Sequence, residues 1–344
     1  MMKLPPFTTT GIGSVPETKP GEACQKIFLR ELTAPFWPQL PKRDYLELMI
    51  PQFSEGLPCL FADTASRKTW CHVDSSKDAR MQEFYNKLLK NSPAEFAVSE
   101  KYAAGLHAFI RLAPEHNDFL KGQITGPLTF TLGINDQGGT PIYFDPELRE
   151  AAVQLLKQKA LFEIELLKKK SSNVLLSVDE PILAAYGSSV YVGISEKDVI
   201  SCVNEIITPV KNTGSCSAMH CCGNTDWSLA IKTGIDILCF DAYNYSHTIM
   251  LYPDSVKSLF ERGGYLAWGI VPTTPDVANE TADSLVQKLV ERFSLLSNKG
   301  ISRQLIEERA VLTPACGAGS LDKELSNQVF YLLEEIAEIM RGEK

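Results

Sequence analysis

Short apolar stretches recur along the chain, and each of them ends in small or polar residues. Eight such segments are candidate strands: 8–16, 57–63, 119–127, 173–181, 215–223, 235–243, 265–273 and 309–317. Runs of apolar and β-branched residues bounded by turn-forming residues are typical of buried strands. The pattern therefore predicts a sheet built from eight segments.

Longer segments lie between the candidate strands, and their apolar residues recur at spacings of three and four, as in an amphipathic helix. The clearest of these segments are 146–170, 195–212 and 282–300. Two of them begin with typical helix starts, Ser195 followed by Asp198, and Asp145 before Pro146. Strands and helices are thus predicted to alternate.

Alternation of strands and helices implies parallel pairing, and eight such units are the number that closes a barrel. The sequence therefore predicts an α/β fold, a (β/α)8 TIM barrel, with an open doubly wound sheet as the alternative. The segment 64–118 is too long for one connecting helix, so we expect a helical excursion after strand 2. No linker or low-complexity tract is evident, which predicts a single catalytic domain over residues 1–344.

The composition and charge of the chain indicate which kinds of binding partner and which cellular compartment to expect. The net charge is −8 and the basic residues are scattered, so nucleic acid is not expected to bind. No stretch approaches the roughly 18 apolar residues of a membrane span, and the N-terminus lacks the apolar run of a signal peptide. Nine cysteines without framework spacing suit a reducing compartment. We expect a soluble cytoplasmic protein without disulfides.

Candidate metal ligands lie where the predicted strands end. In "AMHCCGNTDW", alternate side chains share a face, so His220 and Cys222 point one way and Cys221 the other. Asp241 ends the sixth candidate strand and Cys316 ends the eighth. Two thiolates and an imidazole, with at most one oxygen ligand, suit zinc. The alternative is that these cysteines are simply buried in the core.

Ligands that come from three distant segments are typical of a catalytic zinc site and not of a zinc finger. A thiol bound to zinc is deprotonated, so a substrate thiol at an open position would become a nucleophile at neutral pH. The donor set therefore favours activation of a thiol. Activation of water for hydrolysis is the alternative.

Polar residues near other strand ends are candidates for substrate binding. Asp179 and Glu180 end the fourth candidate strand and point to opposite sides, so only one of them faces the barrel mouth. Glu47 precedes the second candidate strand, where a solvated helix face is the alternative. The segment "GIGSVP", which contains Ser14, offers backbone amides to an anionic group or forms only a tight turn. It lacks the G-x-G-x-x-G spacing of an NAD site.

Together these motifs resemble the cobalamin-independent methionine synthases, in the superfamily that also contains uroporphyrinogen decarboxylase and the zinc-dependent corrinoid methyltransferases. The resemblance rests on "TTGIGSVP", "RDYLELM", "KGQITGPLTF", "DEPIL", "HCCGNTDW" with "IDILCFDAY", and "LTPACG". It implies that His220, Cys222, Cys316 and Asp241 hold Zn²⁺, with Asp241 where the family usually has glutamate.

The resemblance also implies a binding site for homocysteine, and hence a methyltransferase that makes methionine. The backbone at Ile12 and the hydroxyl group of Ser14 would bind the carboxylate of homocysteine. Glu47 and Asp179 would bind its ammonium group, and Asp179 is the expected catalytic residue. Opposite charges in a partly desolvated site fix the orientation of a substrate.

The chain departs from the full-length methionine synthases in features that concern the methyl donor. It corresponds to the catalytic barrel alone, and "GIVPTTPDV" contains no histidine after the seventh candidate strand. The tryptophan expected to stack on folate is missing where the chain reads "TLGIND". We therefore expect the donor to be a methylcorrinoid and not methyl-folate. A corrinoid protein is the expected partner, because the chain has no D-x-H-x-x-G motif of its own.

Other functions stay open at this point. The motif "HCCGNT" is similar to the H-x-C-G-N of methyltransferases that act on coenzyme M, although a sulfonate thiol would not need the amino-acid-binding set. A uroporphyrinogen decarboxylase-like protein would need an arginine-rich N-terminal motif, which is absent. A binding or regulatory barrel without turnover is the non-enzymatic alternative. Cys221 and Cys239 are interpreted as packing residues, and His247 receives no role.

Overall fold

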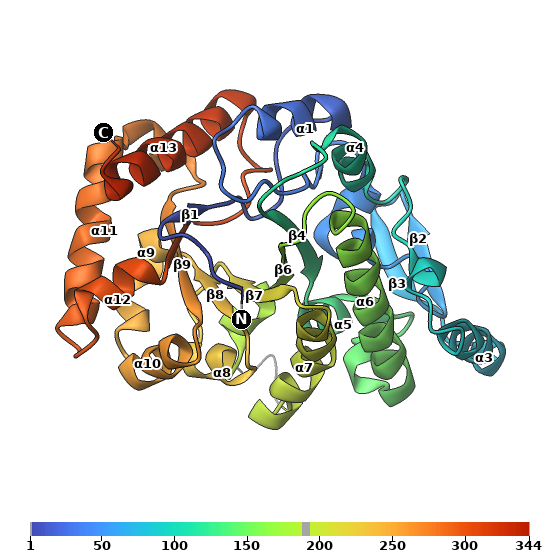
Figure 1. Ribbon diagram of the computed structural model, residues 1–344. Helices are drawn as coiled ribbons and strands as arrows, with labels where there is room; N and C mark the ends of the chain where they lie inside the picture. The colour runs from blue at the N-terminus through green and yellow to red at the C-terminus, as the bar shows by residue number, and fades with distance from the viewer. Residues whose placement is uncertain (1, 188–192, 344) are drawn as a thin grey trace.

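The computed structural model describes residues 2–187 and 193–343, and its central element is a curved, all-parallel sheet of seven strands (Figure 1). The strands lie in the order β1-β10-β9-β8-β7-β6-β4. Their bounds are β1 (Thr8–Thr9), β4 (Leu120–Thr125), β6 (Val174–Asp179), β7 (Cys216–Cys221), β8 (Ile237–Phe240), β9 (Tyr265–Val271) and β10 (Ala310–Pro314). All their residues are buried, as expected of parallel strands covered on both faces.

The second candidate strand, 57–63, is not part of this sheet, so its prediction as a barrel strand was wrong. A separate sheet of three strands consists of β2 (Leu60–Asp63), β3 (Lys68–Cys71) and β5 (Asn135–Asp136). In it, β2 and β3 form an antiparallel hairpin. Phe61 stacks on Trp70 across this hairpin, with 5.8 Å between the ring centroids. Phe61 thus finds its partner in the hairpin, whereas Leu57 and Cys59 belong to the main hydrophobic core.

The place between β1 and β4 is bridged instead by the Pro-rich segment 34–39. The amide of Ala34 donates to the carbonyl of Thr9 on the β1 side at 3.0 Å. On the other side, the amide of Lys121 in β4 donates to the carbonyl of Pro35 at 2.8 Å. The two prolines of the segment lack an N–H group, which prevents a regular ladder. The sheet is therefore TIM-like in its strand order, but eight regular strands do not close it.

Helices cover the outer face of the sheet (Figure 1). The helices of the described residues are α1 (Pro20–Phe28), α2 (Met49–Gln52), α3 (Lys77–Leu88), α4 (Ala104–Leu112), α5 (Pro127–Gly133), α6 (Pro146–Leu167), α7 (Glu196–Asn212), α8 (Trp227–Lys232), α9 (Ala242–Ile249), α10 (Pro253–Glu261), α11 (Ala282–Ser297), α12 (Arg303–Glu308) and α13 (Lys323–Arg341), and not all of them lie on that face. Short 3-10 helices span Tyr45–Glu47, Pro93–Phe96, Ile142–Phe144, Pro181–Ala185 and Pro275–Asn279. Across the described residues, every helix is too short or too polar to cross a membrane.

The three clearest helix predictions are confirmed as α6, α7 and α11. Asp145 caps α6 by accepting hydrogen bonds from the amides of residues 147 and 148. Ser195 and Asp198 form a reciprocal capping box at the start of α7. The predicted excursion over 64–118 is only partly helical, because β3 precedes α3 and α4 in it. Figure 1 shows β2, β3 and α3 extending to one side of the sheet.

A buried carboxyl group on α6 anchors the bridging segment 34–39. The Oε1 atom of Glu163 accepts hydrogen bonds from Nε1 of Trp37 at 2.7 Å and from the amide of Gln123 at 2.8 Å. Its Oε2 atom is buried and has no partner among the described atoms. Burial raises the pKa of Glu163 to about 8, although the hydrogen bonds from Trp37 and Gln123 oppose this effect. The carboxyl group is therefore mostly protonated at pH 7.

We expect the variant Glu163→Gln, which mimics the protonated acid, to gain stability over the parent protein as the pH rises. A carboxyl group whose pKa is raised on folding stabilises the fold below its unfolded pKa near 4.5, and this stabilisation is lost as the pH rises through the folded pKa near 8. The unfolding free energies of parent and variant should diverge by about 2 kcal/mol between pH 6 and pH 9. Urea unfolding across this range measures the difference. Glu165→Gln, exposed on the same helix, is the control; a divergence of the same size there would contradict the prediction.

Candidate active site

Seven of the eight residues expected to form the site lie around one cavity at the C-terminal ends of the strands. The cavity has a volume of about 320 Å³. The predicted residues that line it are Ile12, Ser14, Glu47, Asp179, His220, Cys222 and Cys316. Parallel strands bring their C-terminal ends to one face, so residues far apart in the sequence meet there. A volume of this size suits a ligand as small as an amino acid.

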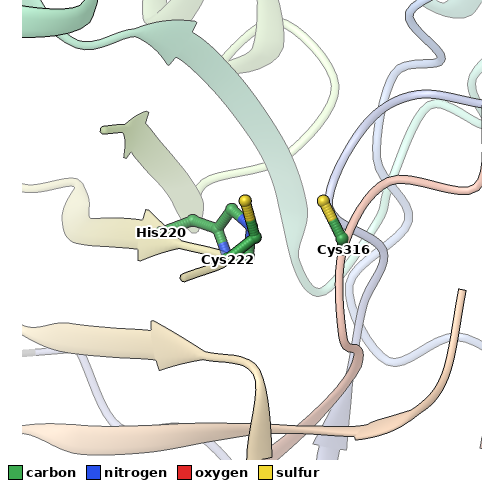
Figure 2. A group of neighbouring side chains, drawn as sticks. All are labelled: His220, Cys222 and Cys316. Carbon is green, nitrogen blue, oxygen red and sulfur yellow. The ribbon is translucent and has the colours of Figure 1, made fainter. Parts of the chain in front are cut away.

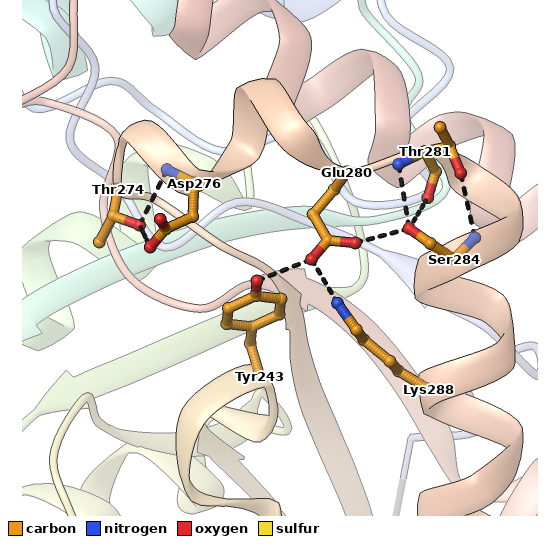
Figure 3. Close-up of polar contacts among 7 residues, drawn as sticks. All are labelled: Tyr243, Thr274, Asp276, Glu280, Thr281, Ser284 and Lys288. Atoms are coloured by element: carbon orange, nitrogen blue, oxygen red, sulfur yellow. Dashed lines mark hydrogen bonds and ion pairs between the residues drawn. The ribbon is translucent and has the colours of Figure 1, made fainter.

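His220, Cys222 and Cys316 form a compact set of metal-binding donors. Figure 2 shows His220 and Cys222 on one segment and Cys316 facing them from another. One donor atom of each residue lies within 4.8 Å of the other two. Around a tetrahedral zinc ion such ligand atoms lie about 3.5 to 3.8 Å apart, so these atoms would need to approach one another by at most about 1 Å. The residues therefore fit a zinc ion.

The electrostatics of this set favour a thiolate. The pKa of Cys222 is lowered to about 4, because the neighbouring thiol of Cys316 and imidazole of His220 stabilise its thiolate. The same interaction with Cys222 raises the pKa of Cys316. Burial lowers the pKa of His220, but the surrounding sulfurs, Cys239 foremost, outweigh burial and raise it overall. Because the thiolate is the form of cysteine that binds metals, Cys222 is the residue of this set that is already in that form at neutral pH.

Asp241, the eighth expected residue, stands apart from this donor set. Its Oδ1 atom accepts a hydrogen bond from the amide of Asn244 at 2.8 Å, and its Oδ2 atom accepts one from Nδ2 of Asn244 at 2.7 Å. Asp241 thus caps α9, as aspartate often does at a helix start. Both of its carboxylate oxygens already have partners, and its role as a zinc ligand stays a prediction.

The two carboxylates at the end of β6 point to opposite sides, as the alternation of a strand requires. Asp179 faces the cavity and accepts a hydrogen bond from Oγ of Ser177 at 2.6 Å. Burial raises its pKa. Glu180 accepts hydrogen bonds from the amides of Leu128 and Thr129 at the start of α5, both at 2.8 Å. Asp179 is therefore the carboxylate available to a ligand, and Glu180 holds α5.

Glu47 lines the cavity but is already paired. Its carboxylate forms an ion pair with Arg43 and accepts a hydrogen bond from the amide of Leu40 at 3.2 Å. Its side chain is buried, and burial raises its pKa to about 7 against the opposing effect of Arg43. Glu47 is thus not the solvated helix residue of the alternative interpretation. Because Arg43 already pairs with Glu47, a cationic group of a ligand would compete with Arg43 for this carboxylate.

The turn after β1 packs against the segment that follows Cys316. The Oγ atom of Ser14 accepts a hydrogen bond from the amide of Gly319 at 3.3 Å, and the carbonyl of Ser14 accepts one from the amide of Ala318 at 2.9 Å. A Cβ atom at position 317 would lie 2.1 Å from Oγ of Ser14, so glycine is required there for this approach. The Ser14 turn and one of the metal-binding cysteines are therefore held together.

A buried lysine that the sequence analysis missed supports this turn. The Nζ atom of Lys121 donates to the carbonyl of Ile12 at 2.7 Å and to Oε1 of Gln123 at 3.1 Å. Burial lowers the pKa of Lys121, and the charge of Asp179 opposes this. Lys121 therefore holds the backbone of this turn in place at Ile12. A lysine within an otherwise buried strand was the signal that could have revealed it.

Six further residues that line the cavity received no role from the sequence. They are Gln39, Pro41, Leu48, Met49, Pro181 and Gly317. Gln39 ends the bridging segment, Pro41 follows it, and Leu48 and Met49 lie at the start of α2; the strand pattern placed none of these four residues in the barrel. All nine cysteines are free thiols. Cys221 is buried, with its thiol donating to the carbonyl of Gly223, and His247 is exposed on α9.

Comparison with known proteins establishes similarity of fold. No protein-family model matches the chain, and no curated protein does. A B12-independent methionine synthase from a Shewanella species, in complex with selenomethionine, has a TM-score of 0.60 at 16% sequence identity, covering 98% of both chains. A methyltransferase from Methanosarcina mazei has a TM-score of 0.52 at 13% identity, covering 96% of this chain and 93% of that one. At such identities the likeness concerns the TIM-like α/β fold.

Proposed function

We propose that this protein is a zinc-dependent methyltransferase that methylates the thiol of homocysteine to give methionine. The observation that carries the proposal is the meeting of His220, Cys222 and Cys316 with Asp179 around one small cavity. The two similar structures, one a methionine synthase and the other a methyltransferase, support this activity through the shared fold.

The metal-binding residues leave room for a substrate. Three protein ligands with an open position are typical of catalytic zinc sites. Zinc held by His220, Cys222 and Cys316 would lower the pKa of a thiol at the open position, so that the thiolate is present at neutral pH. Asp241 would act as a fourth ligand only after releasing its hydrogen bonds to Asn244.

The remaining residues of the cavity would hold the amino-acid part of homocysteine. The amides of the turn from Ile12 to Ser14, together with the Ser14 hydroxyl group, would donate to its carboxylate. The buried carboxylate of Asp179 would bind its ammonium group, with Glu47 as a second, shared charge. Hydrogen-bond donors at one end and a negative charge at the other would fix the orientation of homocysteine. Its side chain would then place the thiol near His220, Cys222 and Cys316.

A methylcorrinoid is the methyl donor that we propose. In the transfer, a bond forms between sulfur and the methyl carbon while the cobalt–carbon bond breaks, and its electron pair stays on cobalt. The thiol proton is released when the thiolate forms, so the overall reaction is balanced. Two absences in the sequence favour this donor over methyl-folate, namely the histidine after β9 and the tryptophan after "TGPLTF". A corrinoid protein would then be the partner.

A panel of donors and acceptors tests the proposal. We expect the purified protein to contain about one zinc ion per chain and to form labelled methionine from homocysteine and methylcobalamin or a methylated corrinoid protein. Methyl-folate should give no product. Product is measured by mass spectrometry, and a reaction without protein gives the spontaneous rate.

The same panel separates the alternatives. A preference for coenzyme M over homocysteine would indicate a different thiol substrate and would overturn the assignment of Asp179. A metal-free protein that binds porphyrin would indicate a decarboxylase-like function. Binding of homocysteine without product from any donor would favour a regulatory protein.

A further inference from the structure

Three polar side chains lie in a row across adjacent strands of the sheet. Asp179 on β6 is in register with His220 on β7, and His220 is in register with Cys239 on β8. Residues in register on neighbouring parallel strands point to the same face of the sheet. Cys239 therefore lies beside His220 because of the strand pairing itself.

The two ring nitrogens of His220 have different surroundings. Nδ1 lies 3.3 Å from Sγ of Cys239. That sulfur is also 3.6 Å from Oγ1 of Thr313 on β10, and Cys239 is only 5% exposed. Nε2, in contrast, is buried and has no partner among the described atoms. One nitrogen is thus held by a thiol, and the other is left for the donor set with Cys222 and Cys316.

The chemistry of imidazole decides what Cys239 must do. A neutral imidazole carries one N–H group, and the nitrogen that binds a metal must offer a lone pair. If Nε2 binds the metal, the proton is on Nδ1 and is donated to Sγ of Cys239. The opposite arrangement, in which the thiol donates to Nδ1, would put the proton on Nε2 and block the site.

We propose that Cys239 is a positioning residue that holds His220 in the tautomer and ring orientation needed to bind the metal. The inference rests on the proposed metal site. A histidine ligand usually donates its second N–H to a carboxylate, carbonyl or water. Here two thiolates already balance the two charges of zinc, and a further carboxylate would leave a buried net charge. The sulfur of Cys239 provides the acceptor without adding a carboxylate.

The test measures metal affinity in four proteins: the parent chain, Cys239→Ala, Cys239→Ser and Cys216→Ala. Cys216 is the matched control, because it belongs to the same buried cluster as Cys239 and lies on β7 well before His220. Zinc affinity is measured by competition with a chelator, and Co²⁺ absorption reports the coordination geometry. Neither readout requires methyl transfer.

We expect Cys239→Ala to weaken zinc binding by about 10- to 100-fold and to reduce the tetrahedral Co²⁺ absorption bands. Cys239→Ser, whose hydroxyl group can still accept the N–H, should stay within a few-fold of the parent, and so should Cys216→Ala. If Cys239→Ala does not fold, the pair Cys239→Thr and Cys239→Val replaces it. Threonine has a hydroxyl group where valine has a methyl group, so only the threonine variant can accept the N–H and should keep the zinc affinity.

The outcomes separate this inference from the proposed function. Equal zinc affinity in the parent and Cys239→Ala, or an equal loss in Cys216→Ala, would overturn the role of Cys239 alone. Normal metal binding without methylation of homocysteine would overturn the proposed function and leave Cys239 as a positioning residue. A parent protein that binds neither Zn²⁺ nor Co²⁺ would overturn both.

Discussion

Replacing Cys222 or Cys316 by serine is expected to abolish zinc binding and methyl transfer. Each substitution removes one of the three donor atoms that lie together among the described residues. A serine hydroxyl group is not ionised at neutral pH and is a poor zinc ligand compared with a thiolate. We expect the zinc content to fall from about one ion per chain to near zero, and the rate of methionine formation to fall at least about 1,000-fold.

The measurement needs controls that separate loss of the metal from loss of the fold. Cys221→Ala changes the neighbour of Cys222, whose thiol donates to the carbonyl of Gly223, and Cys202→Ser changes a partly buried cysteine on α7. Both should keep their zinc. Circular dichroism and thermal unfolding with a chelator show whether each variant is folded. A folded Cys222→Ser or Cys316→Ser protein with normal zinc content and activity would place the site elsewhere.

The residues of the donor set could be predicted from the sequence because their positions follow from the strands. His220, Cys222 and Cys316 each lie at or just beyond the C-terminal end of a strand, and parallel strands bring those ends to one face. The alternation of a strand also predicted that Asp179 and Glu180 would separate. The parallel strand order accounts for the first result, and the period of two within a strand accounts for the second.

The eighth place of the barrel could not be predicted in this way. Segment 34–39 contains two prolines and no alternation, so it has no strand signal, although its backbone bonds to both β1 and β4. Segment 57–63 carries the strand signal but pairs with β3, because strand propensity does not specify a partner. Closure of the sheet is a tertiary property.

Roles that depend on register or on side-chain contacts were also missed. Cys239 was interpreted as a packing residue and Lys121 received no role, because their partners, His220 and Ile12, are distant in the sequence. Asp241 was expected among the metal ligands, and its use as the cap of α9 became visible only with Asn244 beside it. Local sequence patterns therefore predict which residues reach the site, but they do not predict which residues these side chains contact there.

Asp179→Asn is expected to weaken the use of homocysteine selectively. Asparagine keeps the shape of the side chain and an oxygen that can accept from Ser177, but it removes the negative charge that faces the cavity. Loss of one partner of a buried charge pair costs about 2 to 5 kcal/mol, so kcat/KM for homocysteine should fall roughly 100-fold. Most of the loss should appear in KM, because the ammonium group makes the same contact before and during transfer.

A substrate without the ammonium group provides the decisive comparison. 4-Mercaptobutyrate has the thiol and carboxylate of homocysteine but no ammonium group, so the parent protein and Asp179→Asn should methylate it with similar efficiency. Glu180→Gln is the control variant, since this neighbouring carboxylate points to α5 and should not affect KM. If Asp179 served only to balance the buried charge of Lys121, the variant would be less stable and would lose activity equally toward both thiols. Equal losses of kcat/KM toward both thiols would therefore show that Asp179 does not bind the substrate. A loss confined to homocysteine would show that the charge of Asp179 binds the ammonium group and so selects an amino acid.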